Sequence, residues 1–172
     1  MTPSPLLFES PSSEFRVVAR SGPIDEMHSM CRASPSKETG GILIGFYSED
    51  RRTANVIEIT GPPPDSERTR DQFKRGVTGL RSLLLGRWQA TRQTHYLGEW
   101  HYHTAHVPRP SAQDERQMRA VAVDPRYGCA EPLLMIICPG TVSSWSIGCF
   151  AFPRGRSCTP LHPIDAGPPR PP

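Results

Sequence analysis

The sequence predicts a mixed α/β domain built around a mainly antiparallel sheet, and two patterns carry this prediction. Short apolar runs bounded by Gly and Pro recur along the chain, and they alternate with longer segments whose apolar residues return at helical spacing. The 172 residues are enough for one ordinary hydrophobic core. We therefore expect one working domain at residues 14–152, between a flexible Pro- and Ser-rich segment at 1–13 and a flexible Pro-rich tail at 153–172.

Strands are expected where apolar residues run together or alternate between turn signals. The run at 42–46 follows two glycines and precedes a polar turn, so it should form a hairpin with residues 54–60. Gly61-Pro-Pro-Pro ends that hairpin, and the charged residues 65–70 predict an exposed, mobile loop. The same criteria predict further strands at 15–19, 94–103, 133–138 and 141–152.

Helices are expected where apolar residues recur every three or four positions. Pro23 opens a short helix that should end near residue 34, and a second helix at 111–123 follows a Pro-containing loop. Residues 77–90 predict a packing helix, because one stripe of its surface is apolar. That stripe contains Leu80, Leu83, Leu84 and Trp88.

Composition excludes several classes of partner. The net charge is only +3 and the arginines are scattered, so we expect no nucleic-acid binding. We also expect no membrane association, because no apolar run approaches the length that spans a bilayer. Five cysteines without a C-x-x-C pair suit a reducing compartment better than a disulfide framework, and two of them, Cys129 and Cys138, should be small buried hydrophobes. These features predict a cytoplasmic protein.

A candidate metal site lies in and after the strand at 94–103. His101 and His103 are two positions apart, so on a strand both imidazoles point to one face and can reach a single ion. Asp114 falls in the first turn of the following helix and can face back toward them. Two nitrogen ligands and one oxygen ligand suit a catalytic zinc ion, whose fourth position stays open for water.

Two further residues are candidates for the chemistry around such an ion. A water that attacks a carbonyl must lose a proton, and Glu38, just before the strand at 42–46, is the candidate base. The hydroxyl of Ser111 could donate to the oxyanion that forms in the attack. Ser111 and Asp114 are also spaced as a helix cap, and for that pair taken alone capping is the better explanation.

Other assignments stay open around the same strand. A set of three histidines, with His106 replacing Asp114, would also suit zinc. Glu99 shares the face of the ligands and is either their hydrogen-bond partner or a solvated carboxylate. Trp100 and Tyr102 alternate with the ligands and should lie on the opposite face.

The motif residues carry a resemblance to a known family. Glu38-Thr-Gly-Gly-Ile-Leu-Ile-Gly45, Gly98-Glu-Trp-His-Tyr-His103 and Pro110-Ser-Ala-Gln-Asp114 match the pattern E…H-x-H-x7-S-x-x-D. In order and spacing the chain resembles the JAB/MPN metalloprotease family with its JAMM motif, over roughly residues 15–152. The resemblance implies a curved, mainly antiparallel sheet flanked by helices, in a cytidine-deaminase-like layout, with a bound zinc ion.

Roles follow from the resemblance residue by residue. It places the family's general base on Glu38, its metal ligands on His101, His103 and Asp114, and its oxyanion-stabilising serine on Ser111. These are the residues that the chemistry alone had suggested. Thr104, in contrast, stands where many members have proline, so the loop at 104–110 should run differently and alter the fit of the substrate.

Within the family, the chain resembles most the bacterial JAB proteins encoded beside ubiquitin-activating-like and ubiquitin-conjugating-like enzymes, including those of anti-phage CBASS systems. Gly61-Pro-Pro-Pro, the Phe73 segment and residues 96–101 carry this resemblance. It implies a zinc isopeptidase or peptidase that cuts after the C-terminus of a cyclic-oligonucleotide synthase or a ubiquitin-like modifier and so reverses its conjugation. Its partners would be that C-terminal tail and the activating-like and conjugating-like enzymes of the same operon.

Two alternatives keep the fold and change the role. A bacterial ubiquitin-like or sulfur-carrier protein could be trimmed at its C-terminus by the same chemistry. Members of the family without the motif act as scaffolds, although all five motif residues are present here.

Overall fold

The computed structural model describes residues 4–141 and 144–165, and its centre is a closed barrel of strands. Around the barrel the strand order is β1-β10-β9-β8-β7-β3-β4-β2. The pairs β2–β4 and β7–β8 are parallel and the other neighbours are antiparallel, which confirms the mixed, mainly antiparallel fold. The strands are β1 (Leu6–Glu9), β2 (Arg16–Ala19), β3 (Thr39–Tyr47), β4 (Thr53–Ile59), β7 (His95–Tyr102), β8 (Leu133–Pro139), β9 (Trp145–Ala151) and β10 (Thr159–Ile164).

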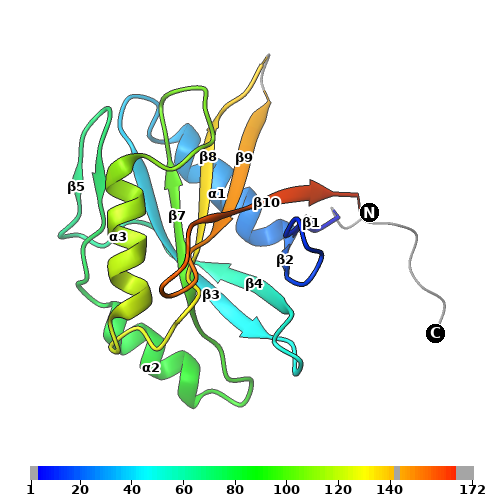
Figure 1. Cartoon of the computed structure of the whole chain (residues 1–172). Coiled ribbons are helices and arrows are strands. Elements are labelled where there is room, and N and C mark those ends of the chain that lie inside the picture. The colour runs from blue at the N-terminus through cyan, green and yellow to red at the C-terminus, as the bar shows by residue number, and fades with distance from the viewer. Residues whose placement is uncertain (1–3, 142–143, 166–172) are drawn as a thin grey trace.

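The main core lies on the inner face of the barrel and includes one helix. Met27 and Cys31 of α1 (Ser21–Arg32) are almost fully buried against inward-facing residues such as Leu43 and Trp100. Pro23 stands in the first turn of α1, where its missing N–H leaves no intrahelical bond unmade. Figure 1 shows α1 on one side of the central strands, with the other helices on the opposite side.

The outer face of β3, β7 and β8 is covered by α2 (Leu80–Gln89) and α3 (Ala112–Val123) (Figure 1). Met118 of α3 is fully buried on this face. The sequence predicted α2, but only part of its apolar stripe packs against the barrel, and Trp88 is 52% exposed. The expectation that Trp88 belongs to the packed stripe is therefore wrong, because α2 meets the barrel through its first turns, at Leu80 and the two leucines that follow.

Both chain ends contribute strands, which corrects the expectation that they lack packed structure. β1 pairs with β2 and β10, and β10 pairs with β9, so these short strands close the barrel. Each buries one large side chain, Phe8 in β1 and Leu161 in β10. Prolines and few apolar residues resemble disorder in the sequence, yet β10 is ordered by pairing on both sides, with β9 and with β1 from the other end of the chain. The expected flexibility of 1–3 and 166–172 lies outside the described residues.

The segment 65–70, expected to be a mobile loop, contains the first strand of a small hairpin. β5 (Glu67–Arg68) and β6 (Phe73–Lys74) form a two-stranded antiparallel ladder, visible at the edge of the molecule in Figure 1. Phe73 is buried and anchors the hairpin against the barrel. The expected exposure is confirmed for Asp65, Glu67, Thr69 and Arg70, although the backbone of the segment pairs with β6 next to one buried aromatic side chain.

A bulge in β7 sets which of its side chains face outward. Leu43 of β3 pairs with Gly98, whereas the next residue, Ile44, pairs with Tyr96, so one extra residue of β7 stands between them. Gly98 has φ +152°, and a Cβ at this position would overlap the backbone of Leu133. As a result Tyr96 and Glu99 both face the outer side.

Among the described residues, no helix is both long and apolar enough to cross a membrane.

The predicted burial of Cys129 and Cys138 is confirmed, since their side chains are 6% and 0% exposed.

We expect Leu161→Ala to lower the free energy of unfolding by about 2–5 kcal/mol, because it empties a buried position in the strand that closes the barrel. The matched control is His162→Ala, which changes the next, exposed residue of β10 and should stay within about 0.5 kcal/mol. Urea denaturation measures both. Equal effects of the two variants would mean that β10 does not pack on the barrel in solution.

Candidate metal centre

The register of β3 against β7 brings Glu38 to the two histidines. Gly40 pairs with His101 and Thr39 with Tyr102, so Glu38, one residue earlier, comes opposite His103. Residues directly opposite each other in an antiparallel pair share a face of the sheet. Gly40 leaves space beside His101, where a Cβ would overlap the ring of Phe73 and the backbone of β7.

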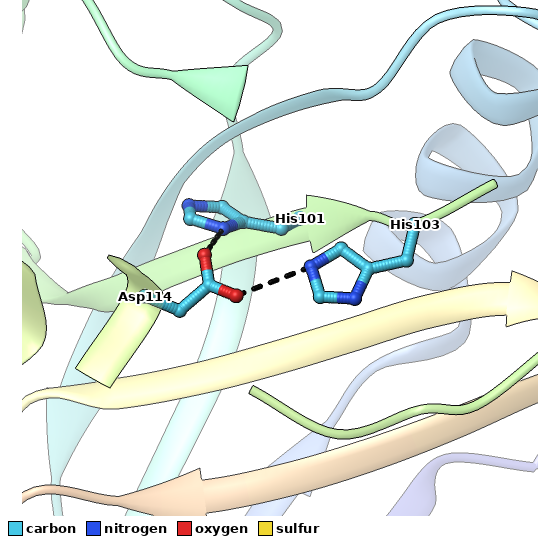
Figure 2. A group of neighbouring side chains, drawn as sticks. All are labelled: His101, His103 and Asp114. Carbon is cyan, nitrogen blue, oxygen red and sulfur yellow. Dashed lines mark hydrogen bonds and ion pairs between the residues drawn. The ribbon is translucent and has the colours of Figure 1, made fainter. Parts of the chain in front are cut away.

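Three of the predicted residues form a compact, buried group (Figure 2). Nδ1 of His101 lies 2.8 Å from Oδ1 of Asp114, and Nε2 of His103 lies 3.3 Å from Oδ2 of the same carboxylate. One ligand atom from each of the three residues lies within 4.8 Å of the others. His101, His103 and Asp114 are 1%, 8% and 5% exposed. In type, number and spacing these atoms can hold a metal ion.

Asp114 is placed by the first turn of α3. Ser111 is the N-cap: its hydroxyl accepts from the N–H of Asp114 at 3.2 Å, and its own N–H donates to Oδ2 of Asp114 at 2.7 Å. The hydroxyl also donates to the same Oδ2, at 2.7 Å. The cap proposed from the sequence is therefore present, and it holds the carboxylate at the start of the helix, facing β7.

The charges of the group stabilise one another. Burial alone would lower the pKa of His101, but hydrogen bonds to Asp114 and Glu99 outweigh it and raise that pKa to about 9. Burial likewise disfavours the charge of Asp114, yet its contacts with the two histidines hold the pKa of its carboxyl well below the usual range. A bound divalent cation would take the place of the imidazolium proton in this balance.

Glu38 lies beside this group in a partly desolvated position. Its side chain is 8% exposed, and burial raises the pKa of its carboxyl, with the nearby His103 opposing that shift. The β5–β6 hairpin clamps its backbone: the N–H of Glu38 donates to the carbonyl of Thr69 at 2.7 Å, and Nε of Arg68 donates to the carbonyl of Glu38 at 3.0 Å. Arg68 also donates to the hydroxyl of Ser34, at 2.6 Å.

The structure decides between the two interpretations of Glu99. Its side chain is fully buried and Oε2 lies 3.2 Å from Nε2 of His101, so it is a hydrogen-bond partner of this candidate ligand and the solvated-carboxylate alternative is wrong. Trp100 and Tyr102 belong to the inner core, as strand alternation predicted.

His106 lies apart from the group. It is exposed, and its Nδ1 donates to the carbonyl of Pro139 at 2.9 Å. In the described part of the chain, the group of ligand-type side chains within reach of one ion is His101, His103 and Asp114. The hydroxyl of Thr104, where the family pattern has proline, donates to the carbonyl of Arg70 and ties the loop after β7 to the β5–β6 hairpin.

Sequence reasoning missed the residues that support the site. Phe73 packs edge-on against the ring of His101, with 5.1 Å between ring centroids, and Arg68 holds the backbone of Glu38. Arg75 forms a buried ion pair with Glu99. Nothing in local spacing singles these residues out, since their partners lie far away in the sequence.

Comparison with known proteins places the chain in a family. It matches the family described as prokaryotic homologs of the JAB domain over residues 22–148. The chain belongs to this family. A relative from Enterobacter hormaechei subsp. hoffmannii (strain UCI 50), named CD-NTase/cGAS isopeptidase, is 41% identical over 157 residues, which cover 91% of this chain and 86% of that protein. A relative of the same name from Pseudomonas aeruginosa is 34% identical over 91 residues, or 52% of this chain and 56% of that protein.

The fold of this JAB chain also has a solved counterpart. The solution structure of a protein from Desulfitobacterium hafniense matches it with a TM-score of 0.54 at 19% identity, over 84% of this chain and 87% of that one. The likeness shows a shared fold.

The choice between Asp114 and His106 as third ligand can be tested by metal content. We expect Asp114→Ala to lose the bound metal, because it removes the carboxylate between the two imidazoles, and His106→Ala to keep it. Elemental analysis after purification with zinc reports both. Metal lost from His106→Ala and kept by Asp114→Ala would instead establish the three-histidine set.

Proposed function

We propose that this chain is a zinc-dependent isopeptidase that hydrolyses the bond after the C-terminus of a conjugated protein. The observation that carries the proposal is the buried His101, His103 and Asp114 group beside Glu38, in a chain 41% identical to a protein named CD-NTase/cGAS isopeptidase. Family membership supports hydrolysis, and the donor atoms support a metal.

Zinc fits the donor set. Two imidazole nitrogens and one carboxylate oxygen are the ligand types of catalytic zinc sites, which keep a further position for water or substrate. When bound, zinc supplies Lewis-acid chemistry, since it polarises a carbonyl group and makes a water molecule more acidic. The buried surroundings strengthen these electrostatic effects.

In the proposed mechanism Glu38 moves the protons. Its carboxylate accepts a proton from the attacking water and then gives one to the leaving amine, so the same group acts as base and as acid. Burial raises the pKa of Glu38, which makes both directions of transfer easier near neutral pH. The backbone bonds to Thr69 and Arg68 keep the carboxylate at the edge of the ligand group.

Ser111 would stabilise the oxyanion through its hydroxyl. In the structure this hydroxyl donates to Oδ2 of Asp114, so the proposed role requires it to rotate toward the substrate carbonyl. The backbone N–H of Ser111 keeps its own bond to Asp114, and the helix start therefore stays in place during the rotation.

The substrate we propose is the C-terminal tail of a cyclic-oligonucleotide synthase joined to a target. The names of the two relatives support this choice over other modifiers. The chain would then reverse a conjugation carried out by activating-like and conjugating-like enzymes of the same system, as part of anti-phage defence in the cytoplasm.

The proposal is tested with a fusion that joins the tail of such a synthase to a reporter protein. The native, zinc-loaded protein should cut at the junction, and Glu38→Gln should slow cleavage by about 10²- to 10⁴-fold while keeping its zinc. Glu131→Gln, which changes an exposed carboxylate, is the matched control. Intact mass measures the products, and elemental analysis measures the metal.

Each outcome supports or contradicts a different part of the proposal: the reaction, the substrate or the enzymatic activity itself. Cleavage by the native protein and the control alone would support the reaction and the role of Glu38. A zinc-loaded protein that leaves the synthase tail intact but cuts a ubiquitin-like or sulfur-carrier fusion would contradict the substrate, and one that cuts neither would contradict the enzyme.

A second prediction concerns Arg68. Because Arg68 holds the carbonyl of Glu38, we expect Arg68→Ala to lower kcat by about 10- to 100-fold, as the base drifts from its position, with zinc content unchanged. Arg81→Ala, which removes an exposed arginine from α2, should keep the native rate. Steady-state kinetics with the same fusion measure kcat and KM for both variants. A raised KM with an unchanged kcat would mean that Arg68 binds substrate instead.

A further inference from the structure

Glu99 is a fully buried carboxylate with a complete set of hydrogen bonds. Its Oε1 lies 2.9 Å from Nε of Arg75 and 3.3 Å from the hydroxyl of Tyr96. Its Oε2 lies 2.7 Å from Nε2 of Gln117 and 3.2 Å from Nε2 of His101. An ionised carboxylate accepts about four hydrogen bonds, so these four donors use its whole capacity.

Two of the donors come from elements other than β7. Arg75 follows β6 and its side chain is 3% exposed, so the ion pair with Glu99 is enclosed. Gln117 lies one turn after Asp114 on α3, and the two side chains therefore point the same way from that helix. Glu99 thus joins β7, α3 and the end of the hairpin at a single carboxylate.

Removing both charges of an enclosed ion pair from water costs free energy, which their mutual attraction often does not recover. Replacing such a pair by apolar residues is often neutral or stabilising. The guanidinium of Arg75 is itself held, since it also donates to the hydroxyl of Tyr127 at 2.7 Å and to the carbonyl of Gly76 at 2.7 Å. With Arg75 fixed in this way, the ion pair holds the carboxylate of Glu99 in one position, next to Nε2 of His101.

The bond to Glu99 determines which nitrogen of His101 carries the hydrogen. A carboxylate paired with arginine only accepts, so Nε2 of His101 must be the N–H that donates to it. Nδ1 donates to Asp114 as long as His101 is an imidazolium, and when a metal ion takes the place of that proton the bond to Glu99 keeps the hydrogen on Nε2 and leaves the lone pair on Nδ1. Figure 2 shows that this Nδ1 faces Asp114 and that the other nitrogen points away from it.

We propose that Glu99, fixed by Arg75 and Gln117, is a positioning residue that orients His101 so that Nδ1, and not Nε2, is the atom offered to the metal ion. The inference rests on the proposed zinc site and adds to it the atom that binds and the residues that select it. Carboxylates behind a ligating imidazole hold its tautomer and its ring, and their loss weakens metal binding.

Zinc affinity tests this role without relying on activity. Glu99→Gln keeps the shape of the side chain but loses the charge and one acceptor, and it should weaken zinc binding by about 10- to 100-fold. Glu58→Gln is the matched control, because Glu58 of β4 also pairs with an arginine, Arg87 of α2, at 2.7 Å, and lies outside the candidate metal group. Competition with a chelator measures the dissociation constants, and thermal unfolding of the zinc-free proteins measures stability.

A weaker affinity for Glu99→Gln than for Glu58→Gln, with similar thermal midpoints, supports the proposal. Equal affinities of Glu99→Gln and the native protein would overturn it and leave the proposed function intact. A native protein that binds no zinc would overturn the inference and the proposed metal site together.

A second measurement needs no variant and so does not depend on Glu99→Gln folding. Long-range ¹H–¹⁵N spectra of the zinc-loaded native protein distinguish the two ring nitrogens of each histidine. We expect the hydrogen of His101 on Nε2 and the shift of a metal-bound nitrogen on Nδ1. The opposite pattern, with the hydrogen on Nδ1, would overturn the assignment.

Discussion

The pairing of β3 with β7 is the constraint on which the candidate site depends. It sets Glu38 opposite His103 and Gly40 opposite His101, so two stretches far apart in the chain share one face of the barrel. Strand alternation puts Glu99 on this outer face together with His101, and the bulge at Gly98 brings Tyr96 to the same face. A slip of one residue in either strand would turn these side chains into the core, where an unpaired charge is costly.

The site concentrates charge in the interior, and the arrangement keeps that charge paired. His101 stands between two carboxylates, Asp114 on one ring nitrogen and Glu99 on the other. Glu99 is balanced by Arg75 and Asp114 by the two imidazoles. Such networks contribute little to net stability, but they hold side chains in one geometry, as binding a metal ion requires.

Helix capping and ligand placement use the same atoms at the start of α3. The carboxylate of Asp114 accepts the N–H of Ser111, which stabilises the helix, and it also faces the imidazoles. The capping interpretation of the S-x-x-D spacing is confirmed, and it is compatible with a ligand role for Asp114. On the other side, the β5–β6 hairpin contacts the candidate base and a candidate ligand, through Arg68 to Glu38 and through Phe73 to His101.

Local spacing in the sequence determined which side chains of the candidate site share a face and where the helix after them begins. Alternation along a strand predicted that His101 and His103 share a face, and the helix-start signal predicted where Asp114 lies, because both depend on backbone geometry over a few residues. The tertiary structure alone decided the closure of the barrel by β1 and β10, the half-exposed Trp88, the ordered β5–β6 hairpin and the Arg75–Glu99 pair. These features join residues distant in the chain, so they follow from strand register and side-chain packing, which short-range patterns do not encode.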